Sequence, residues 1–381
     1  MRRRLVAVIS VIIALVFLVP ACAAPAAPTT STTPTTPTTP TILTTSTTPT
    51  TPTTPTTPTP TTTAKVVDWN INVTFVDAHH VSKSLKWFAA ELEKRTGGRI
   101  KASVHPAGAL GTSAEALDNL RKGLSDVSNF SSYTAAVGVY PLWEVTMLPG
   151  LLPNAVAVNY ITWDLYRRGY LSTGKSKIEG VKLIGITGVE ELWVFTTKKR
   201  VTTLEDYKGM TIDMSGIWRT RSMEKLGVVG QNIPQADRYS ALQRGIVDGT
   251  YYGVGMITSL KLWEVVKYGQ MNPFSQAPIK VAINESAFNK LPADLQVIVL
   301  DVARDFNYVL VDGFLEEQER GLALCKQNGV DMYSISPAEW NRIVEKFAPV
   351  NEEWVKELEG KGLPAGEVLN VVKTDLKKMG Y

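Results

Sequence analysis

The chain has 381 residues, of which 40 are lysine or arginine and 36 are aspartate or glutamate. Arg2, Arg3 and Arg4 account for most of the basic excess, since 37 basic residues remain against 36 acidic ones without them, a balance of +1. A balance this close to neutrality provides no electrostatic footprint for nucleic acid, so we expect no nucleic-acid partner.

The first 22 residues have the pattern of an export signal, in which the three arginines precede an apolar stretch over 5–19. That stretch is short for a permanent membrane span. It ends at Val19-Pro20-Ala21-Cys22, which resembles the lipobox of bacterial lipoproteins. We therefore predict lipidation at Cys22 and an extracytoplasmic or periplasmic location on the membrane surface. An ordinary cleaved signal with an incidental Cys22 is the alternative.

Residues 23–64 are almost entirely threonine and proline. This composition has no apolar face to bury, so we expect a disordered, extended linker between the membrane and the folded part. The remaining 317 residues, 65–381, are enough to bury a large core. If Cys22 is lipidated, Cys325 has no disulfide partner and is expected to be a small buried hydrophobe.

Short apolar runs alternate with helical periodicity from residue 70 onward. We predict strands over 70–76, 100–104 and 126–130, with helices over 81–95 and 114–121 between them. This alternation is typical of the α/β class. Three further helices are expected towards the C-terminus, over 291–325, 337–358 and 366–379.

One segment is repeated. Residues 120–127 (LRKGLSDV) resemble residues 242–249 (LQRGIVDG), and in both a helix is predicted to end at glycine before a strand that starts after aspartate. Two such units more than 100 residues apart suggest two lobes of related build.

Enzyme signatures are absent or out of context. Residues 169–176 match the letters of a phosphate-binding loop, but a helix is predicted before them and a strand after them, the reverse of the order that this loop requires. The sequence has neither a Gly-x-Ser-x-Gly elbow nor a His-Glu-x-x-His helix. We therefore expect no enzyme activity, no cofactor and no metal site.

Several side chains are candidates for lining a ligand cleft. His79 and His80 follow the first predicted strand, and Ser131 follows the strand over 126–130. The two adjacent histidines cannot both face one side of an extended chain, so they are candidates for a cleft or a solvated turn rather than for a metal.

Aromatic residues gather where strands are expected to end. Trp193 follows the strand predicted over 181–186, Tyr251 and Tyr252 follow Asp248, and Trp218 lies next to Arg219. Ligand crevices of open α/β sheets lie beyond the carboxyl ends of the strands, so these rings could line a cleft. A place in the core is the alternative for any one of them.

Six motifs together resemble the DctP-type substrate-binding proteins of tripartite ATP-independent periplasmic (TRAP) transporters. They lie at 92–100, 106–111, 204–209, 239–249, 263–268 and 291–296, in the order of the family, and cover about residues 70–330. The resemblance implies two α/β lobes of the periplasmic-binding-protein type, a long bracing helix and an interlobe cleft that closes on a small organic ligand. It also implies TRAP permease subunits in the membrane as partners, without an ATPase.

The resemblance suggests lobe boundaries. We expect the first lobe at about 65–189 and 281–320, the second at about 190–280, and C-terminal helices over 321–381.

The chain departs from the family at one informative position. The resemblance implies an arginine four residues after Lys208-Gly209, where it would bind the ligand's carboxylate, but Asp213 stands there. In one interpretation Arg219 or Arg221 binds an organic acid instead. In the other, which we favour, the ligand is neutral or cationic and Asp213 contacts it among Trp193, Trp218, Tyr251 and Tyr252. Asp213 could also point outward with no role.

Two other functions remain open at this point. The same fold would serve a ligand-sensing protein that reports to a membrane receptor, and a neighbouring permease gene would favour transport. The other function is that of an extracytoplasmic hydrolase, but the sequence shows no recognisable nucleophile–base pair. Turnover of small esters or amides would support this function.

Overall fold

Two β-sheets organise the chain, and the loops at the ends of their strands form the cleft described below. The computed structural model describes residues 66–131, 138–189, 191–276 and 278–381. The predicted export signal, Cys22 and the linker over 23–64 lie outside the described residues. Residues from Thr62 to Tyr381 belong to one compact unit.

The first sheet defines the first lobe and has the strand order β2-β1-β3-β10-β4. β1 is parallel to β2 and β3, whereas β10 is antiparallel to β3 and β4. The strand predicted over 70–76 begins earlier, at Val67, and ends earlier, at Asn72. Beyond Asn72 the N–H of Thr74 donates to the side chain of Asn129, at Oδ1 and 2.9 Å, instead of to the backbone of a neighbouring strand. The five strands are β1 (Val67–Asn72), β2 (Ile100–His105), β3 (Val127–Phe130), β4 (Val181–Thr187) and β10 (Ile279–Asn284).

The second sheet defines the second lobe and has the order β11-β9-β5-β8-β6-β7. Trp193 follows β4 as predicted but lies within a further strand, β5, and Tyr251 and Tyr252 lie within β8, so these rings do not gather at strand ends as expected. The segment over 321–381 contributes β11 as well as helices. The six strands are β5 (Leu192–Thr196), β6 (Thr211–Asp213), β7 (Val229–Gln231), β8 (Gly249–Gly253), β9 (Tyr268–Gln270) and β11 (Asp331–Tyr333).

The repeated segment forms the same structure in both lobes. Helix α3 (Ala116–Lys122) ends at Gly123 and α7 (Arg238–Arg244) ends at Gly245, with φ of 74° and 71°. The aspartate that follows bonds to the neighbouring parallel strand in each case, since Asp126 Oδ2 accepts Asn70 N–H and Asp248 Oδ2 accepts Thr211 N–H, both at 2.8 Å. The predicted likeness of the two segments is therefore present in their backbone.

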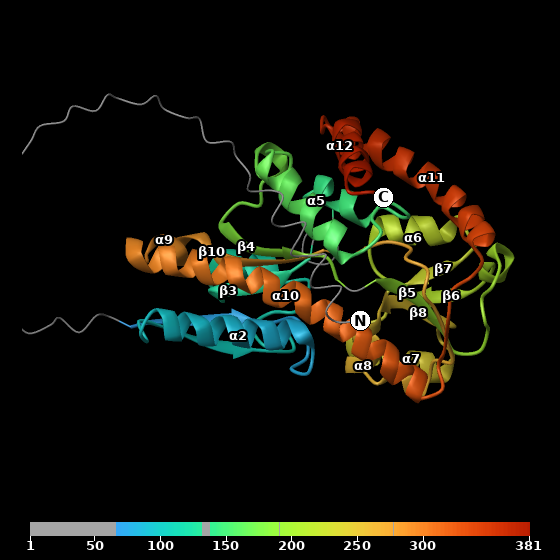
Figure 1. The fold of residues 1–381 in the computed structure, drawn as a ribbon, viewed down its shortest axis with the longest axis horizontal. Coiled ribbons are helices and arrows are strands. Elements are labelled where there is room, and N and C mark those ends of the chain that lie inside the picture. Colours follow the sequence, from blue (N-terminus) through green and yellow to red (C-terminus); the bar gives the residue numbers. More distant parts are fainter. Residues whose placement is uncertain (1–65, 132–137, 190, 277) are drawn as a thin grey trace, which may run out of the picture. The chain divides into compact units, whose positions relative to one another are not determined.

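One long helix, α10 (Ala293–Gln327), braces the two lobes. It packs against α2 (His80–Arg95) and β4 in the first lobe, and against α8 (Val254–Ser259) and β11 in the second (Figure 1). Its inward face carries fully buried apolar residues such as Phe306 and Leu310. The helix predicted over 291–325 is confirmed.

A loop and a helix precede β4 in the order expected from the sequence. Helix α5 (Ala155–Arg167) begins at its cap, Asn154, whose side chain accepts the N–H of Ala157 at 2.9 Å. A loop with one 3-10 turn, η2 (Gly174–Ser176), then leads into β4. Residues 169–176 thus lack the strand–loop–helix geometry that phosphate binding requires.

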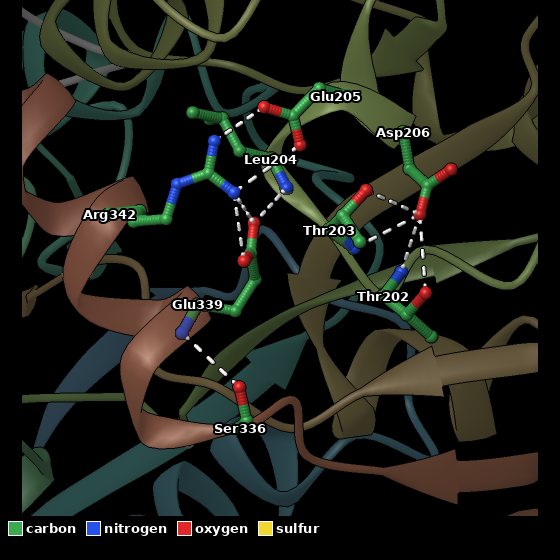
Figure 2. Close-up of polar contacts among 8 residues, drawn as sticks. All are labelled: Thr202, Thr203, Leu204, Glu205, Asp206, Ser336, Glu339 and Arg342. Carbon is green, nitrogen blue, oxygen red and sulfur yellow. Dashed lines mark hydrogen bonds and ion pairs between the residues drawn. The ribbon is translucent and has the colours of Figure 1, made fainter.

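Helix α11 (Pro337–Glu359) joins the second lobe to the C-terminus. Its cap, Ser336, accepts the N–H of Glu339 at 3.2 Å, and Glu339 in turn accepts the N–H of Leu204 in the 3-10 turn η3 (Leu204–Tyr207) (Figure 2). Arg342 bridges Glu339 and Glu205. Most of these contacts are solvent-exposed, so they orient α11 against η3 but add little stability.

The remaining helices complete the layers around the two sheets. α12 (Ala365–Lys378) follows α11 and packs against α5 and η1 (Pro141–Met147), while α11 itself contacts α6 (Ile217–Glu224). The other short elements are η4 (Gln235–Asp237), η5 (Leu262–Glu264) and α9 (Glu285–Asn289).

Candidate functional site

A cleft with a volume of about 660 Å³ lies between the loops of the two lobes. The first lobe lines it with residues after β1 and at the end of β3, including Thr74, Phe75 and Ser131. The second lobe lines it with the loop 232–236 after β7, with Arg238 and with Tyr252 of β8. Both walls therefore lie at carboxyl ends of strands, where α/β sheets bind ligands.

A smaller cavity of about 40 Å³ adjoins the cleft and shares part of its wall. The shared residues are Phe75, Tyr252, Met256 and Ile279. Its remaining wall is mainly apolar and is formed by Val189, Leu192, Gly253 and Phe314, together with His79 and Arg219. We call this smaller, mainly apolar space the inner cavity, and the larger cleft is the more polar of the two, a combination that small-molecule sites generally have.

Asp213 lies beneath the cleft and not in its wall. The side chain is fully buried, and its Oδ2 forms an ion pair with Arg238 Nε and accepts the hydroxyl of Thr250 at 2.8 Å. Its Oδ1 accepts the N–H of Ile233 at 3.0 Å. The carboxylate therefore has partners within the protein, which removes the basis for the favoured prediction that it contacts a neutral or cationic ligand.

Arg238, which the sequence did not single out, takes the position facing the cleft. It is the first residue of α7 and is 3% exposed. Its Nη2 donates to the carbonyl of Ile233 at 3.1 Å, and its guanidinium carbon lies 4.1 Å from the ring centre of Tyr252. Nη1 has no hydrogen-bond partner among the described residues. The presence of Asp213 where an arginine was expected is a signal that a basic residue elsewhere in the chain pairs with it. The sequence does not indicate which basic residue that is.

The two arginines predicted as substitutes are placed differently. Arg219 is 1% exposed, lines the inner cavity and lies over the ring of Tyr251 at 5.2 Å. Arg221 instead pairs with Glu357 of α11 at 3.1 Å. Of these two, the structure brings only Arg219 to the site.

Tyr252 and Ser131 line the cleft, whereas three other predicted residues lie in the core. Trp193 donates to Glu191 Oε2 at 3.2 Å and Trp218 donates to Glu144 Oε2 at 2.6 Å. The hydroxyl of Tyr251 bonds Ser275 at 2.7 Å. In β8 successive side chains point to opposite faces, so Tyr252 faces the cleft and Tyr251 the interior.

The two histidines differ as well. His79 lines the inner cavity, and its Nδ1 accepts the N–H of Val81 at 3.3 Å, which places the proton of the neutral ring on Nε2. Burial lowers the pKa of His79 to about 3, so the ring stays neutral. His80 packs against Phe314 outside the cleft wall, and burial lowers its pKa as well.

Charge in the wall has one sign. Arg219 and Arg238 are the charged side chains among the described residues that line the two cavities, and none of those lining residues is a carboxylate. The same described residues contain no cluster of three or more histidine, cysteine or acidic side chains suited to a metal ion. Within these ranges no helix is both long and apolar enough to span a membrane.

Comparison with known proteins places the chain in a family. The model for bacterial extracellular solute-binding protein, family 7, matches residues 72–357. A solute-binding protein of Verminephrobacter eiseniae is 26% identical over 300 residues, which cover 78% of this chain and 87% of that protein. The C4-dicarboxylate-binding periplasmic protein DctP of Rhodobacter capsulatus is 25% identical over 285 residues, or 72% and 82% of the two chains.

Solved structures agree in fold. A TRAP solute-binding protein of Rhodoferax ferrireducens T118, in complex with copurified benzoate, has a TM-score of 0.73 at 21% identity and covers 82% of this chain and 98% of that chain. The two-lobed α/β architecture expected from the sequence is confirmed, and so is the resemblance carried by the six motifs. The chain belongs to bacterial extracellular solute-binding protein family 7, and it is an extracytoplasmic solute-binding protein of the TRAP transporter type.

Proposed function

We propose that the chain captures a small organic anion in the cleft between its lobes and delivers it to the membrane subunits of a TRAP permease. The observation that supports this most is the charge of the two cavities: Arg219 lines the inner cavity, Arg238 lines the cleft, and the described lining residues include no carboxylate. Asp213, which pairs with Arg238, is not one of the lining residues. A ligand carboxylate is attracted to positively charged groups in the wall, whereas a cationic ligand is repelled by them.

The apolar part of the wall indicates what the rest of the ligand is like. Phe75, Met256 and Ile279 line both the cleft and its inner cavity, so the body of the ligand meets carbon on several sides. A carboxylate on an apolar or ring-bearing body fits this division better than a highly hydroxylated one. Closure of the lobes would then remove both ends of the ligand from water.

A thermal-shift screen tests this assignment. We expect small carboxylates, with benzoate and succinate among them, to raise the melting temperature of the mature protein, while the uncharged amides benzamide and succinamide raise it much less. A ligand that binds the folded state alone at 100 times its Kd adds about 2.7 kcal/mol to the free energy of unfolding. Protection by amines or neutral sugars with no response to any carboxylate contradicts the anionic ligand.

We also infer that the ligand is bound without being changed. His79, the histidine that lines the inner cavity within the described residues, uses Nδ1 to accept a backbone N–H and is kept neutral by burial, so it has no basic nitrogen for activating a hydroxyl. In the same screen, the stabilising compound should be recovered unaltered after incubation with the protein.

We further propose that Cys22 carries the lipid that tethers the chain to the membrane. The support is the lipobox-like sequence at 19–22, followed by a Thr/Pro-rich segment that can span the distance to the folded part. Mass spectrometry of the mature N-terminus is expected to find a diacylglyceryl group on Cys22, and Cys22→Ala should release the protein from the membrane fraction. A soluble mature chain that begins downstream of Cys22 rules the anchor out.

A further inference from the structure

Arg238 lines the cleft, and two of its three guanidinium nitrogens have hydrogen-bond partners within the protein. Its Nε donates to Asp213, its Nη2 donates to the carbonyl of Ile233, and its face lies over the ring of Tyr252. The remaining nitrogen, Nη1, has no partner among the described residues, although only 4% of the side chain is exposed. A buried donor without an acceptor destabilises the empty state until an acceptor arrives.

Asp213 is itself fixed by the second sheet. It is the last residue of β6, and its two oxygens are occupied by Arg238, by the hydroxyl of Thr250 in the adjacent strand β8 and by the N–H of Ile233. Thr250 belongs to the sheet, whereas Ile233 lies in the loop after β7. The carboxylate is therefore oriented by β6 and β8 and transmits that orientation to the guanidinium.

We propose that Arg238 is the residue that binds the ligand's anionic group, through Nη1, and that Asp213 is the positioning residue that aims it. This inference rests on the proposed function, because it takes the ligand to be an organic anion. Asp213 occupies Nε and the carbonyl of Ile233 occupies Nη2, so Nη1 is the nitrogen left to donate to a ligand oxygen. The ring of Tyr252 covers one face of the guanidinium. Charge-assisted hydrogen bonds of this kind are stronger than neutral ones.

The test compares carboxylates with their amides, because damage to the fold alone would weaken both equally. Benzoate, benzamide, succinate and succinamide are titrated by calorimetry into the wild-type protein and into the double variant D213N/R238Q. The double variant removes both buried charges together and keeps a polar side chain at each position, so it avoids the cost of leaving one ion unpaired. Circular dichroism and the melting temperature without ligand confirm that it is folded.

We expect the affinity for the carboxylate to fall about 10- to 100-fold in D213N/R238Q, with little change for the amide, since a hydrogen bond to a charged group is lost. Arg238→Lys, which keeps the charge and can still pair with Asp213, should retain part of the carboxylate-over-amide preference. Asp213→Asn, which keeps the guanidinium but loosens it, should also retain part of the preference while binding more weakly. Arg221→Gln is the matched control, because its guanidinium pairs with Glu357 outside the cleft, and it should behave as wild type.

The outcomes separate this inference from the proposed function. If wild type prefers the carboxylates and D213N/R238Q keeps the same carboxylate-over-amide ratio, Arg238 does not bind the anionic group, while the proposed function stands. If wild type shows no preference for either carboxylate over its amide, the proposal of an anionic ligand is wrong, and so is the proposed role of Arg238. A loss of preference in Arg221→Gln equal to that in the double variant also overturns the assignment.

Discussion

Asp213→Ala is expected to lower the free energy of unfolding by about 3–5 kcal/mol, because it leaves the guanidinium of Arg238 buried without its counter-ion. Two further groups also lose their acceptor, since the N–H of Ile233 and the hydroxyl of Thr250 both bond this carboxylate. Asp213→Ala is therefore expected to destabilise the fold of the second lobe even when no ligand is present. Urea denaturation of the protein without ligand measures it.

The control for Asp213→Ala removes the other charge as well. In D213N/R238Q no ion is left unpaired and the amide of residue 213 can still accept hydrogen bonds, so we expect a stability within about 1 kcal/mol of wild type. A cost for Asp213→Ala below about 1 kcal/mol would mean that water reaches the guanidinium of Arg238, and the buried pair described above would be wrong.

Lys280→Met is expected to have the second large effect, which is a change in how the free energy of unfolding depends on pH. Lys280 is fully buried in β10, and its ammonium nitrogen lies 4.6 Å from the ring centre of Trp143. Burial lowers the pKa of Lys280 from 10.5 to about 7, although the nearby Glu144 opposes the shift. Between pH 7 and pH 10.5 the unfolded chain therefore holds a proton that the folded chain has released.

The sign of the effect follows from this difference in bound protons. Because the unfolded state binds more protons in that window, stability rises with pH there, by up to about 1.4 kcal/mol per pH unit. Below pH 7 both states are protonated and the full cost of the buried ammonium is present. We expect wild type to gain roughly 2–3 kcal/mol between pH 7 and pH 9, and Lys280→Met to lack this gain and to be the more stable protein at pH 6.

Denaturation curves for both proteins at each half unit of pH check this. The comparison stops at pH 9, because burial raises the pKa of Cys325 to about 11 and this thiol lowers stability as the unfolded chain ionises. Glu144→Gln removes the group that opposes the shift, so the rise should begin at a lower pH. Parallel profiles for wild type and Lys280→Met would show that Lys280 stays protonated in the folded state.

Local chemistry explains the parts of the fold that could be predicted. The helix ends at Gly123 and Gly245 need a left-handed residue, and Asp126 and Asp248 each accept a backbone N–H of the neighbouring parallel strand. The local sequence of the repeated segment is therefore enough to predict its structure. The long helix over Ala293–Gln327 could also be predicted from local sequence, because apolar residues with helical spacing, Phe306 and Leu310 among them, continue along it.

The candidate site was harder to predict, because strand contacts decide which side chains reach it. Tyr251 and Tyr252 are neighbours, yet only Tyr252 lines the cleft, since alternate residues of β8 face opposite sides of the sheet. Trp193 and Trp218 were grouped with them by type but lie in the core, each with its indole N–H bound to a glutamate. Aromatic composition alone does not separate these two places.

The sequence by itself determined the family, the α/β class, the two related lobes and the bracing helix, because periodicity, caps and motifs act over a few residues and survive without their surroundings. Only the tertiary structure decided that Asp213 is fully buried in an ion pair with Arg238, 25 residues later, and that Arg238 lines the cleft. The attraction between two charges depends on their separation in space and on their burial, and neither can be read from the amino-acid sequence alone.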